Sequence, residues 1–160
     1  MRVALFLAFL AIAAGYAVWK GGGPERMMAA IALTMVGLDK LLHLFIPPNF
    51  VSLDTGHLAI DLFGAGSTVA LALLAHRFWP LCIAVLHLMP LLAHTSRLLS
   101  AGMHPAAYLA MQVATSWPVP AILILATWRH QRRLARGDSE PCWLSSSRPS
   151  TPTTAPPKSC

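Results

Sequence analysis

A group of ionisable side chains lies within long apolar segments, where a membrane or a hydrophobic core would normally exclude them. Each such residue costs free energy unless it is paired or hydrated, so residues of this kind are candidates for a function. Carboxylate and imidazole groups can bind a metal ion or relay a proton, and opposite charges can pair. The candidates are Asp39, Lys40, His43, His57, Asp61, His87, His94 and Arg97.

The spacing of these residues indicates which of them can meet. Asp39 and His43 are four positions apart, so they share one face of a helix. His87 and His94 are seven positions apart and also share a face, with Pro90 between them as a predicted bend. A stripe of polar and small residues, which would let a neighbouring helix approach closely, is formed by His57, Asp61, Gly64 and Thr68.

In the main interpretation this cluster is structural. Asp61 and Arg97 are opposite charges at similar depth on two helices joined by a short turn, so we expect them to form an ion pair. Asp39 is expected to pair with Lys40 or with a histidine. The cluster would then fix how the helices pack.

Two functional alternatives use the same side chains. The first is a metal or haem site, because His43, His87 and His94 with Asp39 and Asp61 supply imidazole and carboxylate donors. No H-x-x-x-H pair accompanies these residues, so the pattern does not specify a metal or haem. The second alternative is a small transporter subunit that moves a proton or a small solute through an Asp/His relay.

The motifs of common enzyme classes are missing from the chain. It contains no H-E-x-x-H zinc motif, no Walker A loop, no G-x-S-x-G elbow and no dinucleotide-binding fingerprint. We therefore expect a protein without enzymatic activity.

The composition indicates that a bilayer surrounds these residues. The chain has 160 residues, of which 56% are hydrophobic and 11% charged, more apolar surface than a soluble domain of this size buries. The formal net charge of +6 could suggest nucleic acid, but the basic residues fall between and after the apolar runs, as topology signals do. We expect the lipid bilayer as a partner and no nucleic acid; a homo-oligomer or a larger membrane complex is left open.

Five apolar segments predict an all-α polytopic bundle of about five transmembrane helices over residues 1–136. Each is about 20 residues long, which at about 1.5 Å per residue crosses about 30 Å of hydrocarbon. The first segment also has features of a signal peptide, but the charge pattern favours a retained helix. The segments are Val3–Trp19, Met27–Ile46, about 57–75, Phe78–Leu99 and Pro105–Trp128.

The basic residues predict an orientation, since the side that keeps Lys and Arg is normally cytoplasmic. Lys20, Arg26, Arg77 and the cluster at 129–136 fall on one side of the predicted bundle. This places the N-terminus outside and the C-terminus in the cytoplasm, with the polar cluster in the outer half of the bilayer. Residues 137–160 are rich in Ser, Thr and Pro and predict a disordered cytoplasmic tail.

Several local stretches resemble a family of small, uncharacterised polytopic proteins of the bacterial inner membrane. The resemblance covers roughly the first 135 residues and implies an inner-membrane location. It implies no substrate, cofactor or catalytic residue. The stretches are 22–26, 60–62, 77–81, 93–98 and 104–108.

Overall fold

The computed structural model describes residues 2–45, 55–99, 113–137 and 143. Within these residues the chain is all-α, with five helices. They are α1 (Arg2–Lys20), α2 (Gly23–Phe45), α3 (Thr55–Leu74), α4 (Trp79–Leu99) and α6 (Pro118–Arg136).

The helix boundaries follow from Gly and Pro at the turns. The N–H of Gly21 donates to the carbonyl of Ala17 at 2.8 Å, and a β-carbon at Gly21 would overlap that same oxygen. Pro24 then stands in the first turn of α2, where its missing N–H costs no helical hydrogen bond. At the C-terminal end of α6 the helix stops at Gly137, which adopts the left-handed conformation with a φ of 76°.

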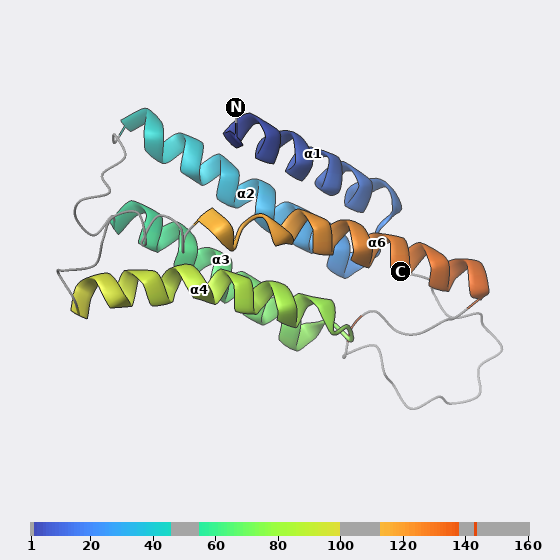
Figure 1. Cartoon of the computed structure of the whole chain (residues 1–160). Helices are drawn as coiled ribbons and strands as arrows, with labels where there is room; N and C mark the ends of the chain where they lie inside the picture. The colour runs from blue at the N-terminus through green and yellow to red at the C-terminus, as the bar shows by residue number, and fades with distance from the viewer. Residues whose placement is uncertain (1, 46–54, 100–112, 138–142, 144–160) are drawn as a thin grey trace.

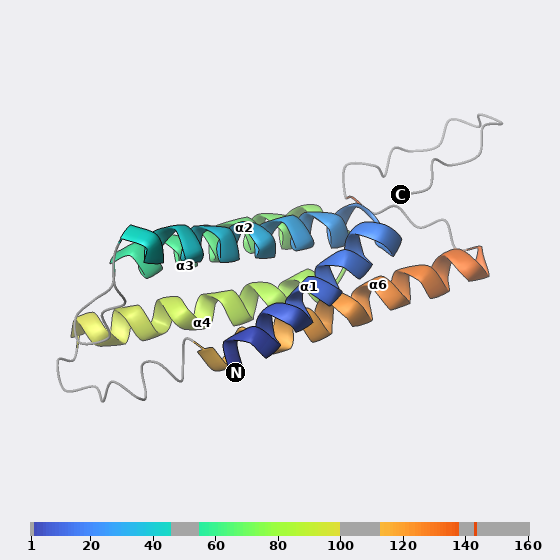
Figure 2. The ribbon, with the colours of Figure 1, turned by 90° about the horizontal axis from the view of Figure 1, so that it is seen from above.

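Successive helices run in opposite directions, and the bundle therefore has two ends (Figure 1). Helix α3 packs between α2 and α4, while α1 packs against α2 and α6 (Figure 2). We call the end formed by residues 20–24, 75–79 and 129–137 the basic end. The opposite end, formed by residues 39–45, 55–61 and 94–99, is called the histidine end. Every candidate residue of the sequence except His87 lies at the histidine end.

The core consists largely of small side chains, and large apolar side chains point outward. Ala13, Ala17 and Ala29 are fully buried, whereas Leu5 and Leu62 are exposed. Helices α1, α2, α3 and α4 are each long and apolar enough to cross a membrane. Helices that are apolar on their outer faces fit a lipid surrounding.

The predicted fifth segment differs from the observed helix. Pro105–Trp128 was expected as one span, but α6 begins at Pro118 and continues to Arg136. Pro118 and Pro120 stand in its first turn, where proline favours a helix start, so they are not kinks within it. The helix continues past Trp128 because Arg, Gln, Leu and Ala are good helix formers. Residues 100–112 lie outside the described part of the chain.

Most of the predicted tail also lies outside the described residues, with the exception of Trp143. Its backbone pairs with that of Ala75, and its side chain packs against the apolar core. The indole lies against Gly23, where an added β-carbon would come within 2.9 Å of Trp143 Cζ2. A tail residue therefore contacts the turns of the basic end, which the sequence did not predict.

Candidate metal centre

Three possible metal ligands converge at the histidine end. Asp39 and His43 come from the last turns of α2, where a spacing of four places them on one face. His57 comes from the first turn of the antiparallel neighbour α3. One ligand atom from each of the three side chains lies within 4.8 Å of the other two. We call Asp39, His43 and His57 the triad.

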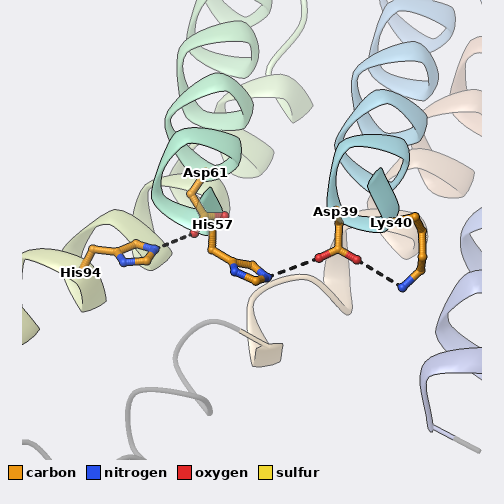
Figure 3. A network of polar contacts seen from close by, with 5 residues as sticks. All are labelled: Asp39, Lys40, His57, Asp61 and His94. Atoms are coloured by element: carbon orange, nitrogen blue, oxygen red, sulfur yellow. Dashed lines mark hydrogen bonds and ion pairs between the residues drawn. The ribbon is translucent and has the colours of Figure 1, made fainter. Parts of the chain in front are cut away.

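The members of the triad already contact one another. His57 Nε2 lies 3.4 Å from Asp39 Oδ1, and Lys40 Nζ lies 3.2 Å from Asp39 Oδ2 (Figure 3). The rings of His43 and His57 meet edge to face, with centroids 5.1 Å apart. Asp39 therefore receives a cation on one oxygen and an imidazole on the other.

A second acid–histidine pair lies beside the triad, one helical turn along α3. His94 of α4 is 1% exposed, and its Nε2 lies 3.0 Å from Oδ2 of Asp61, a distance at which the imidazole N–H donates to the carboxylate (Figure 3). Asp61 is four residues after His57, so both pairs share a face of α3. The pair joins α3 to α4, whereas the triad joins α2 to α3.

The geometry of the triad suits a divalent transition metal. Two imidazoles and one carboxylate form a donor set that Zn²⁺ and similar ions accept, with metal–ligand distances of about 2.0–2.2 Å. Donors around such an ion stand about 3–4 Å apart, so the three atoms need only small side-chain rotations to close on it. The ammonium group of Lys40 competes with a metal ion for the Asp39 carboxylate, because a bound metal ion would displace it.

The arrangement favours a single ion over haem. Two histidines that ligate one haem iron stand on opposite faces of the macrocycle. His43 and His57 are in edge contact at a centroid distance of 5.1 Å, which leaves no room for a macrocycle between them.

The predicted donors separate into three groups in the structure. Asp39 and His43 belong to the triad, and Asp61 and His94 form the adjacent pair. His87 lies two helical turns deeper on α4, with its Nδ1 3.8 Å from the position of a β-carbon at Gly64. It is separate from the triad.

The predicted ion pair between Asp61 and Arg97 stays a prediction. Arg97 belongs to the last turn of α4, but its side chain is outside the described part of the chain. Within the described residues Asp61 contacts His94. Both expected partners of Asp39, Lys40 and a histidine, are present.

His57 was not among the metal donors expected from the sequence. The signal that could have found it is the antiparallel hairpin of α2 and α3, which sets residues near the end of one helix opposite those at the start of the next. The register of the hairpin decides the contact, and spacing within one helix does not reveal it.

Two further buried ionisable residues, Glu25 and His130, lie at the basic end. Glu25 is 1% exposed, and neither carboxylate oxygen has a hydrogen-bond partner within the described residues. Its Oε2 and His130 Nε2 each lie 3.1 Å from the position of a β-carbon at Gly22. Gly22 thus leaves the space in which the acid and the imidazole approach each other.

No protein-family model, no curated protein and no solved structure matches this chain. The chemistry of the triad is therefore inferred from its own atoms.

Proposed function

We propose that this chain is an integral membrane protein whose triad binds one divalent transition-metal ion. The observation that supports this most directly is the convergence of ligand atoms from Asp39, His43 and His57 within 4.8 Å. Zn²⁺ is the natural probe, because it accepts both imidazole and carboxylate and prefers no geometry of its own. The membrane location is supported by four helices long and apolar enough to span a bilayer.

A purely structural role fits the triad less well than it fits the buried pair of Asp61 and His94. The contact of Asp39 with Lys40 joins neighbouring residues of one helix, and their side chains are 33% and 54% exposed, so it does not hold two helices together. The buried contact of His94 with Asp61 is the one suited to fixing helix packing. We therefore assign the structural role to that pair and ligand binding to the triad.

The two pairs together resemble a proton relay, but their placement argues against transport. Asp39, His57, Asp61 and His94 all lie at the same end of the bundle (Figure 3). A proton passed among them would move across that end and not along the helices from one side to the other. Metal binding needs no such path.

We propose binding without catalysis, in the bacterial inner membrane, with the triad on the outer side. The basic end carries Lys20, Arg26, Arg77 and the arginines of α6, which supports a cytoplasmic location for that end. The N-terminus would then face outward and the C-terminus inward. An outward site would sample metal ions before they reach the cytoplasm.

Calorimetric titration of the full chain in detergent with Zn²⁺ tests the proposal. We expect about one ion per chain for the native protein and at least a tenfold weaker affinity for His43→Ala and for His57→Ala, since each removes one of three protein ligands. The matched control is His76→Ala, which removes an exposed histidine at the opposite end. Equal affinity in His57→Ala and the native protein would refute the site.

A further inference from the structure

A cavity of about 630 Å³ opens at the basic end, between α6 and the turn that joins α3 to α4. Its described lining contains five arginines and one histidine but no acidic residue. The basic lining residues are His76, Arg77, Arg129, Arg132, Arg133 and Arg136. We propose that this cavity binds the phosphate headgroup of an anionic membrane phospholipid.

The positions of the arginines favour an anionic ligand. Four of them stand at 129, 132, 133 and 136 in α6, so their spacing gathers them on one helical face. Arg77 reaches the same cavity from the α3–α4 turn. Guanidinium groups match phosphate in particular, because they donate two parallel N–H bonds to it.

The walls of the cavity favour a lipid over a soluble phosphate. Toward the middle of the bundle the lining changes to Ile122 and Leu125, and Leu125 is 51% exposed. Acyl chains could lie along these side chains while the headgroup meets the arginines. Trp128 lies between the apolar and the basic parts of the lining, and the Arg132 guanidinium stacks 4.1 Å from its ring centroid. Tryptophan at such a boundary is typical of the membrane interface.

The proposed orientation agrees with an anionic lipid as the ligand. The basic end is the cytoplasmic end, and anionic lipids concentrate in the cytoplasmic leaflet, where basic pockets between helices bind their headgroups. This inference rests on the proposed membrane location but not on the metal site. The two ends of the bundle would then bind opposite charges.

The test uses the full chain in neutral detergent, with phosphatidylglycerol added in mixed micelles and bound lipid counted by native mass spectrometry. We expect phosphatidylglycerol to bind at least tenfold more tightly than phosphatidylcholine and to bind more weakly as salt rises. Inorganic phosphate tests whether the ligand is a soluble anion, and we expect that millimolar phosphate will not displace the lipid. Displacement by inorganic phosphate, or equal binding of the two lipids, would overturn the lipid assignment.

The variant Arg129→Gln/Arg133→Gln should lose at least tenfold in phosphatidylglycerol affinity. The matched control is Arg26→Gln, an exposed arginine at the same end that is not among the cavity's lining residues, and its affinity should be unchanged. A milder variant, Arg129→Lys/Arg133→Lys, keeps both charges and is therefore less prone to misfold. It should bind the lipid with intermediate affinity, because lysine cannot donate two parallel N–H bonds to one phosphate. Native affinity in both double variants would overturn the proposal.

Different results would contradict the membrane location and the headgroup site. A chain that remains in solution without detergent would contradict the membrane location itself. A chain that requires detergent and still binds both lipids equally would contradict the headgroup site alone.

Discussion

His94 and Asp61 join α4 to α3 through one hydrogen bond at 3.0 Å in which the imidazole partner is 1% exposed. A buried polar group that loses its partner costs about 1–3 kcal/mol, so this contact makes the two side chains interdependent. The pairs of Asp39, by contrast, lie at the surface of the bundle.

Asp61→Ala should therefore destabilise the bundle by about 1–3 kcal/mol, because it removes the carboxylate that accepts the hydrogen bond of the buried His94 Nε2. The double variant Asp61→Ala/His94→Leu removes both polar groups and should recover much of the loss. Thermal unfolding in detergent is the measurement. Asp39→Ala is the control and should cost less than Asp61→Ala, because Asp39 is partly exposed at the surface of the bundle. Additive effects of the two changes would show that Asp61 and His94 do not depend on each other.

Gly21 should not tolerate a side chain. A β-carbon there would overlap the carbonyl oxygen of Ala17 and lie 2.7 Å from Glu25 Cβ, and the backbone oxygen cannot move aside without unwinding α1. Gly21→Ala is expected to cost about 1–3 kcal/mol in unfolding free energy.

Gly37→Ala is the control for this change, because nothing lies within 4 Å of a β-carbon at that position. Alanine should leave α2 unchanged or stabilise it by up to about 1 kcal/mol through its higher helix propensity. Equal stability of the Gly21 and Gly37 variants would contradict the packing described for the α1–α2 turn.

The contact of Trp143 with the basic end predicts where the chain can be shortened. Removing all residues after Gly137 removes the indole that packs on Gly23, and we expect a loss of about 1 kcal/mol for this half-buried side chain. Removing residues after 145 keeps Trp143 and should have no effect on stability. If both truncated chains unfold at the temperature of the full chain, the Trp143 contact contributes nothing.

The orientation is tested with reporters placed at the two ends of the bundle. A reporter that works only in the cytoplasm should be active when fused after Arg136, and one that works only outside should be active near Asn49. The physical reason is the concentration of Lys and Arg at the basic end. The reverse pattern at both positions would place the triad on the cytoplasmic side.

The sequence predicted the all-α class and the positions of the first four helices because apolar run length and Gly/Pro punctuation are local signals. Gly21 and Pro24 mark the α1–α2 turn in the sequence and in the structure. The fifth helix was placed too early because hydropathy stops at Trp128, whereas helix propensity continues through the arginines to Arg136.

The candidate site was predictable only in part, because its contacts lie between helices. Spacing within α2 correctly joined Asp39 to His43. The partner of Asp61 and the inclusion of His57 depend on the rotation and register of α3 against its neighbours, which side-chain packing decides. Trp143 could not be foreseen either, since its surrounding sequence has the composition of a disordered tail.

X-ray absorption at the zinc edge of the zinc-loaded full chain shows which atoms hold the metal ion and so tests binding at the triad. We predict nitrogen and oxygen neighbours at about 2.0–2.2 Å, with the scattering pattern of two imidazoles and no sulfur. His57→Ala should reduce the imidazole signal to one ring. Sulfur neighbours at about 2.3 Å would place the zinc on a cysteine such as Cys82, and a spectrum without imidazole would equally contradict the triad.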